Sequence, residues 1–384
     1  MDDIFARRGF LPAHDPATAF PPESPLSVLD TLGRDLPSLL EDPSFREYAR
    51  SLTIPEWSTF ARRASASALR AAADRSADRL ENDLRDETLP YLRLYYVRMG
   101  FLASAYINQV GQPRATVLPR NLAVPLCQAA RLIGRPPILS YDGYALYNWK
   151  RFNNNGAVAL GNIDTFQNFV HLYDEHWFIL VHVAIEAIAA RILGAIGRSA
   201  RWIADANHER LNGELRTIAS AIEEQVLVLR RLPEKMDPAL YHRTFRPYIR
   251  FFENVVYEGV SEAPMNFRGE TGAQSSIMPC LVAFMKIPHR PSALTNHLAE
   301  MRRFMPAEHR AVVAEVEAMP PIRHMAQADA FNFVLAQMAA FRETHYKWAQ
   351  EYINRWTDDP RGTGGTPYME WLKQLIDETL AFRL

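Results

Sequence analysis

Cysteine is scarce in this sequence, with only Cys127 and Cys280 among 384 residues. Because the two do not form a CxxC pair, the sequence argues against a disulfide framework and a zinc ribbon. Two isolated thiols are typical of a reducing, cytoplasmic setting. An excess of basic charge is also missing, since the formal net charge is −1. We therefore expect no nucleic acid and no anionic membrane surface as partner.

Long uninterrupted apolar runs are absent as well. The longest, residues 177–196, is broken by His182, Glu186 and Arg191, which favours a buried helix over a membrane span. Residues 1–25 are charged and rich in proline, and they lack the apolar core of a signal peptide, so we expect an extended arm. With 48% hydrophobic and 23% charged residues, the composition is that of a soluble globular protein.

Several catalytic motifs are missing too. The chain has no GxxxxGK[ST] phosphate loop, no GxSxG nucleophile elbow and no HExxH zinc motif. The run Asp174-Glu175-His176 is too compact for the facial triad of a non-haem iron site. The sequence therefore disfavours the common nucleotide-binding, serine-hydrolase and metalloprotease classes.

What is present is helical periodicity along most of the chain. Residues 26–110 and the chain from about 165 onward contain amphipathic patterns, whereas residues 111–149 alternate prolines with short apolar runs and sustain no strand alternation. The helix that contains residues 177–187 is expected to end at Gly197 as a C-cap. The sequence predicts an all-α fold, with a small helical domain over residues 1–160 and a large helical bundle over residues 161–384.

One predicted helix face carries an inward-facing histidine, His345. Its neighbours on that face follow a 4-3-4-3-4 spacing and are apolar or aromatic: Val334, Met338, Phe341, Trp348 and Tyr352. Such a histidine is either a core residue with a hydrogen-bond partner or the axial ligand of a flat apolar cofactor. Arg342, one turn earlier, either pairs with an anionic group of that cofactor or is solvated.

Further candidates each have an ordinary structural interpretation. His182 lies in an apolar helix and is first interpreted as a hydrogen-bonded core histidine. Arg246 shares a helical stretch with Tyr241 and Phe245, and it either holds a carboxylate or forms a surface salt bridge. The segments 267–276 and 361–369 are rich in small residues, as in flexible loops or in backbone that approaches a ligand closely.

Six segments, taken together and in order, resemble the indoleamine 2,3-dioxygenase family. They are "RPPILSYDGYALYNW" (135–149), "DEHWFILVHVAIEA" (174–187), "FRGETGAQSS" (267–276), "EMRRFMPAEHR" (300–310), "FRETHYKWAQEYI" (341–353) and "GTGGT" (362–366). The N-terminal "RGFLPAHDP" also fits, and we expect a bacterial member of the family.

The resemblance implies two α-helical domains with haem b between them, held in the large domain. His345 would be the proximal iron ligand, and Arg342, Gly269 and Ala273 would contact the cofactor. The "GTGGT" segment would act as a mobile lid. The substrate pocket would be lined by Tyr141, Tyr144, Ala145, Phe178, Tyr241, Arg246, Thr271, Gly272 and Thr366.

The resemblance also changes the interpretation of His182. This residue follows Phe178 by four positions, and that helix face would look onto the distal side of the haem. Vertebrate members have a serine in this place, whereas the related tryptophan 2,3-dioxygenases have a distal histidine. We therefore expect His182 to be the histidine of the catalytic site and to orient the substrate.

Three positions depart from the vertebrate pattern. Tyr241 replaces a phenylalanine and Tyr144 a small residue, which would make the pocket tighter or more polar. Val282 stands where vertebrate members have an acidic residue that supports the proximal histidine. The imidazole would then be less anionic and the iron potential higher.

The function that this resemblance implies is a haem-dependent dioxygenase, which cleaves the indole C2–C3 bond of L-tryptophan or a close analogue to give N-formylkynurenine. Dioxygen would be the co-substrate, the indole a small-molecule partner, and the protein a monomer or weak homo-oligomer. The alternatives are another oxidation or ring rearrangement of a tryptophan derivative, and a haem or gas sensor.

Overall fold

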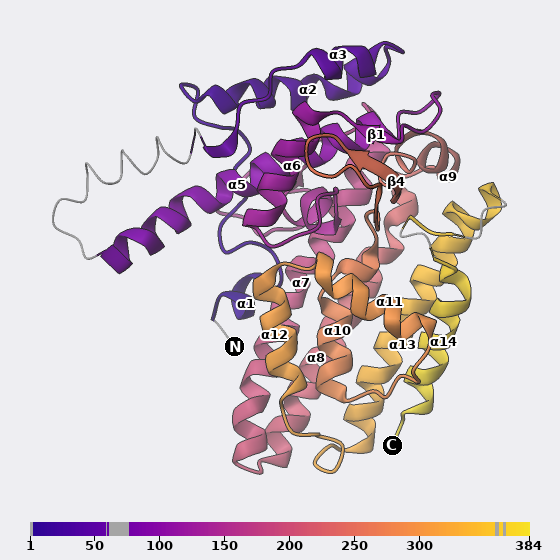
Figure 1. The fold of residues 1–384 in the computed structure, drawn as a ribbon. Coiled ribbons are helices and arrows are strands. Elements are labelled where there is room, and N and C mark those ends of the chain that lie inside the picture. Colours follow the sequence, from indigo (N-terminus) through magenta and orange to yellow (C-terminus); the bar gives the residue numbers. More distant parts are fainter. Residues whose placement is uncertain (1–2, 59, 61–76, 358–360, 364–365) are drawn as a thin grey trace.

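The computed structural model describes residues 3–58, 60, 77–357, 361–363 and 366–384, and helices make up most of it (Figure 1). This confirms the all-α prediction. The longer helices are α2 (Val28–Leu40), α5 (Ala77–Ile107), α6 (Arg120–Leu132), α7 (Tyr173–Ala204), α8 (His208–Arg230), α10 (Ile277–Met285), α11 (Ala293–Met301), α12 (Ala307–Glu317), α13 (Ala328–Tyr352) and α14 (Tyr368–Ala381). Shorter helices and turns are α1 (Asp3–Arg8), η1 (Pro25–Ser27), α3 (Phe45–Ser51), η2 (Asp142–Leu146), η3 (Leu232–Glu234), α9 (Pro238–Leu240), η4 (Tyr241–Phe245), η5 (Gly272–Gln274), η6 (Arg302–Phe304) and η7 (Asn354–Trp356).

Two small sheets accompany the helices in the described part of the chain. β1 (Val117–Leu118) pairs parallel with β4 (Phe252–Tyr257), which pairs antiparallel with β5 (Met265–Phe267). β2 (Lys150–Arg151) pairs antiparallel with β3 (Ile163–Asp164). All except β4 have two or three residues, too few for a period-2 alternation to be visible in the sequence.

Helix α7 is central to the large bundle. It packs along α8, which packs against α13, and α13 packs against α14 (Figure 1). The helix is long and apolar enough to cross a membrane, but most of its apolar stretch is buried inside the protein. The predicted end at Gly197 is wrong, since the helix continues to Ala204. Trp202 and Ile203 in this extension pack against buried apolar side chains, and one internal glycine costs only about 1 kcal/mol.

The predicted extended arm is wrong at its start, where Asp3–Arg8 forms α1 and packs on α7. The next residue, Gly9, has φ +64°, and a Cβ there would collide with the Glu186 carbonyl oxygen. Glycine alone combines this backbone conformation with so close an approach. The N-terminal segment is therefore fitted tightly onto the helix that carries His182.

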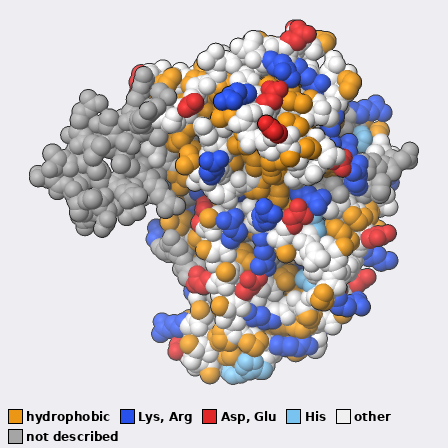
Figure 2. All heavy atoms as spheres, viewed as in Figure 1, with side chains coloured by type: hydrophobic (Ala, Val, Ile, Leu, Met, Phe, Trp, Pro, Cys, Tyr) orange, Lys and Arg blue, Asp and Glu red, His pale blue; other side chains and the backbone are white. Residues whose placement is uncertain are grey.

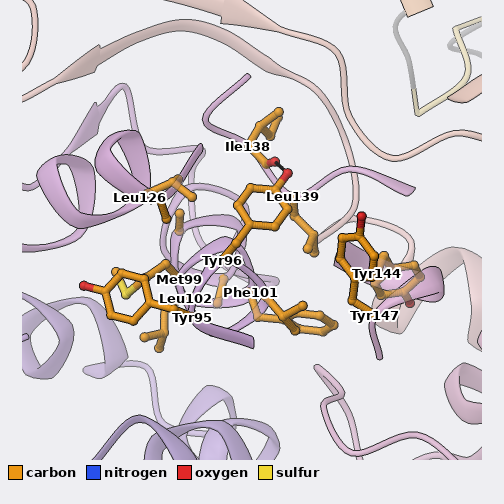
Figure 3. Packing of buried hydrophobic residues seen from close by; sticks show 14 of the residues in the cluster. Tyr95, Tyr96, Met99, Phe101, Leu102, Leu126, Ile138, Leu139, Tyr144 and Tyr147 are labelled. Carbon is orange, nitrogen blue, oxygen red and sulfur yellow. Dashed lines mark hydrogen bonds between the residues drawn. The ribbon is translucent and has the colours of Figure 1, made fainter. Parts of the chain in front are cut away.

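The buried apolar side chains form two clusters. One joins α2, α5, α6 and η2 with residues 248–257, and Figure 3 shows part of it around Tyr96, whose hydroxyl donates to the Ile138 carbonyl oxygen over 2.6 Å. The other joins α7, α8, α10, α12 and α13. Because the segment 248–257 returns to the first cluster, the chain crosses between them more than once. The division into domains at residue 160 stays a prediction.

Candidate functional site

A pocket of about 390 Å³ lies among α7, α10, α11, α13, α14 and the turn η5. This volume is within the range of about 300–1,000 Å³ that is common for cofactor and small-molecule sites. Most of the wall is apolar, and its side chains include Ile185, Leu229, Ile277, Met278, Val282, Leu294, Leu298, Phe341, Trp371, Leu372 and Leu375.

His345 faces this pocket from α13. Protein surrounds the His345 side chain, but the side chain borders the open space of the pocket and is therefore classed as exposed. Burial, with a smaller contribution from His182, lowers the pKa of His345 to about 4. The imidazole is therefore neutral at pH 7, and no described residue hydrogen-bonds to its ring. A neutral imidazole that faces an apolar pocket is a suitable ligand for iron.

His182 lines the same pocket from α7. Its Nδ1 lies 2.7 Å from the carbonyl oxygen of Phe178. A carbonyl oxygen only accepts, so Nδ1 carries the proton, and burial lowers the pKa of the ring and keeps it neutral. Nε2 is then a hydrogen-bond acceptor. If His182 were only a core histidine, both ring nitrogens should have a hydrogen-bond partner. Among the described residues only Nδ1 has one.

An aromatic group adjoins His182. The Phe178 ring lies 4.6 Å from the His182 ring and 5.5 Å from the Tyr241 ring, measured between centroids. Tyr144 lies 6.2 Å from Phe178 and belongs to the packed cluster of Figure 3. These three rings do not line the pocket itself, whereas Tyr141, 5.9 Å from His182, does. Tyr141 is therefore the aromatic ring of this group that a flat ligand in the pocket, beside His182, would meet directly.

Glu186 continues the line of Phe178 and His182 by one helical turn. It is fully buried, and its Oε1 accepts hydrogen bonds from the hydroxyls of Tyr141 (2.9 Å) and Ser275 (2.7 Å). Burial raises the pKa of Glu186 to about 7, and the two hydroxyls oppose that rise. The network holds Tyr141 and the start of α10 in place relative to α7.

Arg246 follows the turn η4 and is 4% exposed, so its interpretation as a surface salt bridge is wrong. The predicted helical stretch is confirmed for Tyr241–Phe245, after which the chain turns toward β4. The Arg246 Nη2 lies 3.5 Å from the Arg361 carbonyl oxygen, while Nε has no partner among described residues. Arg246 does not line the pocket, but it acts on the pKa of its neighbour Tyr241.

Arg342 lines the pocket and is buried, so it is not solvated. Its Nη1 donates to the carbonyl oxygen of Leu375 (2.8 Å) and to the hydroxyl of Thr379, both on α14. Burial lowers the pKa of the guanidinium to about 10, so it stays a cation at pH 7. The pocket wall therefore includes a fixed positive charge.

The two segments rich in small residues meet at the pocket. Four of the residues that the resemblance singled out in them line it: Thr271, Gly272, Ala273 and Thr366. Gly269 does not line it, and a Cβ on Gly269 would collide with the backbone nitrogen of Phe251. Close packing of backbone explains this glycine without a cofactor.

Two further expectations have different outcomes. Ala145 is buried in η2 and does not line the pocket. The expected lid, residues 362–366, includes Gly364 and Gly365, which lie outside the described residues. The roles in binding and catalysis that we assigned to individual residues stay predictions.

The acidic run at residues 174–176 has structural partners. Glu175 Oε2 accepts hydrogen bonds from two backbone nitrogens of the preceding loop, and His176 Nδ1 lies 2.8 Å from Asp164 Oδ1. No cluster of three or more His, Cys, Asp or Glu side chains suited to a metal ion occurs in the part of the chain that the structure describes. Within that part, both cysteines are free thiols.

The resemblance placed the turn "ETGA" (270–273) at the substrate pocket, but sequence reasoning gave no individual role to three polar groups of this region: Glu186, Ser275 and Glu270. Glu186 could have been found, because it lies four residues after His182 on the same helix face. Ser275 and Glu270 carry no such signal, since their positions depend on how a turn packs against α7 and η2.

The comparisons with known proteins agree with this geometry. The family model "Indoleamine 2,3-dioxygenase" matches residues 3–356. Indoleamine 2,3-dioxygenase 1 of Rattus norvegicus is 29% identical over 75% of this chain and 78% of its own. Indoleamine 2,3-dioxygenase 2 of Homo sapiens is 28% identical over the same shares. A 6-hydroxytryptophan 2,3-dioxygenase of Fusarium equiseti is 24% identical over 97% of this chain and 94% of its own. The chain belongs to the indoleamine 2,3-dioxygenase family and is a dioxygenase.

Proposed function

We propose that this protein is a haem b enzyme that uses dioxygen to cleave the C2–C3 bond of the indole ring of L-tryptophan and yields N-formylkynurenine. One observation carries the proposal. Two neutral histidines from different helices, His345 on α13 and His182 on α7, border one apolar pocket, and each has a nitrogen that no described residue occupies.

The residues of the pocket fit a haem. His345 would hold its iron, the apolar side chains of the wall would contact its ring, and Arg342 would supply positive charge for a propionate. Val282 lies on the wall and offers no acceptor to His345, so the imidazole would remain neutral. When bound, the haem would supply the iron chemistry that activates dioxygen.

The chain's own residues would bind and orient the substrate. The indole would pack among Phe178, Tyr141 and Tyr241, and its N–H would donate to Nε2 of His182. The guanidinium of Arg246 would hold the carboxylate of the amino acid. Indole is electron-rich and needs no strong base, so His182 would position the substrate rather than remove a proton.

A substituted tryptophan is the second candidate substrate. Tyr144 and Tyr241 add hydroxyl groups beside Phe178, and the relative from Fusarium equiseti is named for 6-hydroxytryptophan. The test of both is the absorption spectrum of the purified, reduced protein with each amino acid, followed by product analysis under air. Formation of N-formylkynurenine supports the first substrate. Reversible oxygen binding without product would indicate a sensor.

The proposal also covers partners and location. We propose a monomer or weak homo-oligomer in the cytoplasm, with the indole as its small-molecule partner and without nucleic acid or membrane. In support, acidic and basic side chains are interspersed on the face that Figure 2 shows, with no broad area of one sign.

Replacing His182 by serine is expected to slow tryptophan cleavage by about 10- to 100-fold, as is common when an orienting group is lost. 1-Methyltryptophan should be a poor substrate of the native protein, because it lacks the N–H donor. This penalty should shrink in His182→Ser, where the methyl group has room. Steady-state product formation by both proteins with both substrates measures the effect.

Two outcomes would contradict the expected role of His182. Unchanged kinetics with both substrates would return the residue to a purely structural role. A haem-loaded His182→Ser protein without any activity would indicate an obligatory proton transfer.

A further inference from the structure

Glu270 is a buried carboxyl group that the proposed mechanism does not use. It precedes the pocket residues Thr271 and Gly272 and is 3% exposed. Its backbone nitrogen donates to the Ile249 carbonyl oxygen over 3.0 Å, which fixes the residue in place. Its side chain, however, accepts no hydrogen bond from any described residue.

The other two buried carboxyl groups of this region are hydrogen-bonded. Glu175 accepts from two backbone nitrogens and from the hydroxyl of Tyr144, and Glu186 accepts from two hydroxyls. Burying an ionised group without a partner is costly. Burial alone accordingly raises the pKa of Glu270 to about 8. A bound ligand with a positive charge beside Glu270 would offset the cost of burying its ionised carboxylate.

Three tyrosines of the proposed substrate site lie near Glu270. Burial raises the pKa of Tyr141, Tyr144 and Tyr241, and the nearby charge of Glu270 adds to the rise in all three. The hydroxyls of Tyr141 and Tyr144 already donate to the two hydrogen-bonded carboxyl groups. These two hydroxyl protons are therefore not available to Glu270.

A positive charge lies near the same ring of Tyr241. The guanidinium of Arg246 opposes the rise in the pKa of Tyr241, whereas Glu270 adds to it. The side chains of Arg246 and Glu270 are both more than nine-tenths buried, and no ion pair between them occurs among the described residues. An α-amino acid carries one carboxylate and one ammonium group on the same carbon. Arg246 offers a positive charge to the carboxylate, and Glu270 offers a carboxyl group that an adjacent ammonium group would hold in its ionised form.

We propose that Glu270 binds the α-ammonium group of the substrate and, together with Arg246, selects zwitterionic amino acids over indoles that carry a single charge. The inference rests on the proposed function, because it concerns the substrate of the same site. An ion pair with a desolvated carboxylate would also explain why the turn carries a glutamate at a buried position.

The test compares three ligands with the haem-loaded protein and its Glu270→Gln variant. L-Tryptophan has both charges, tryptamine only the ammonium, and indole-3-propionate only the carboxylate. Dissociation constants come from spectral titration of the ferric protein. Glu270→Gln should weaken tryptophan and tryptamine by about 10- to 100-fold, the range of a lost charged hydrogen bond. Binding of indole-3-propionate should stay within about threefold of the native value.

The matched control is Glu262→Gln, which makes the same change of charge at an exposed position. It should leave all three constants unchanged. Equal changes for all three ligands in Glu270→Gln, or none, would overturn the role of Glu270. The native protein gives an independent check without any variant, because it must bind tryptophan at least about tenfold more tightly than indole-3-propionate. Equal affinities there would also overturn the inference.

If the proposed function itself were wrong, the experiment would give a different result from the one that refutes the role of Glu270. In that case the native protein would bind none of the three ligands, or would bind tryptophan without forming product. A native protein that cleaves tryptophan, with a Glu270→Gln variant that keeps the native preference among the three ligands, would refute the inference alone.

Discussion

Replacing His345 by alanine is expected to give a folded, helical protein that retains almost no haem. The side chain borders the pocket and hydrogen-bonds to no described residue, so its removal should leave the packing of α13 intact. Even groups that only support a ligand contribute about 10- to 100-fold to metal affinity, and loss of the ligand itself should cost at least that much. The ratio of Soret absorption to protein, with circular dichroism to check folding, measures the outcome.

His324→Ala is the matched control. His324 lies outside the pocket of His345 and lines a separate one with Ile203 and Pro320. Its replacement should leave the haem content unchanged. If His345→Ala kept a full Soret band and an unaltered ferric spectrum, another histidine on the same wall would be the ligand, namely His182, His289 or His297.

Replacing Arg246 by alanine is expected to raise the Michaelis constant for L-tryptophan steeply. Removing one partner of a buried charge pair costs about 2–4 kcal/mol, which corresponds to roughly 30- to 1,000-fold. Tryptamine has no carboxylate and should be affected far less. Steady-state kinetics with both substrates give the two ratios.

Arg243→Ala provides the control for Arg246. Arg243 lies in the same turn, η4, but is exposed and stacks over the ring of Trp356 at 5.5 Å. Its replacement should change neither Michaelis constant appreciably. Equal losses for tryptophan and tryptamine in Arg246→Ala would show that Arg246 acts structurally, through Tyr241 and the carbonyl of Arg361.

Much of the helical framework could be predicted from the sequence. The spacing of apolar residues placed His345 on the inner face of α13, and the spacing of four placed Phe178 and His182 together on α7. The tautomer of His182 could not be predicted, because it depends on the distance from Nδ1 to one carbonyl oxygen. Periodicity reports which face is buried, but not which atom of a side chain remains unpaired.

The errors have local physical causes. Gly197 is a weak stop signal, and the packing of Trp202 and Ile203 outweighs it. The prolines and charges near the N-terminus predicted an extended arm and not α1. This six-residue helix is too short to be stable by itself and is stabilised by its packing on α7. The burial of the Glu270 side chain could not be predicted for a similar reason, since a turn of small residues gives no sign of which side chain it buries.

The fit of Gly9 against α7 sets an order of events during synthesis. Gly9 and the buried Phe10 leave the ribosome well before α7, because the Glu186 carbonyl against which Gly9 packs is encoded about 175 residues later, roughly 10–35 seconds at the usual rates of translation. Until then the nascent chain carries an aromatic side chain without its burial partner. The N-terminal segment is thus synthesised early but can pack only late. Helix α7, which carries His182, gains the contact with Gly9 only after α7 itself has left the ribosome.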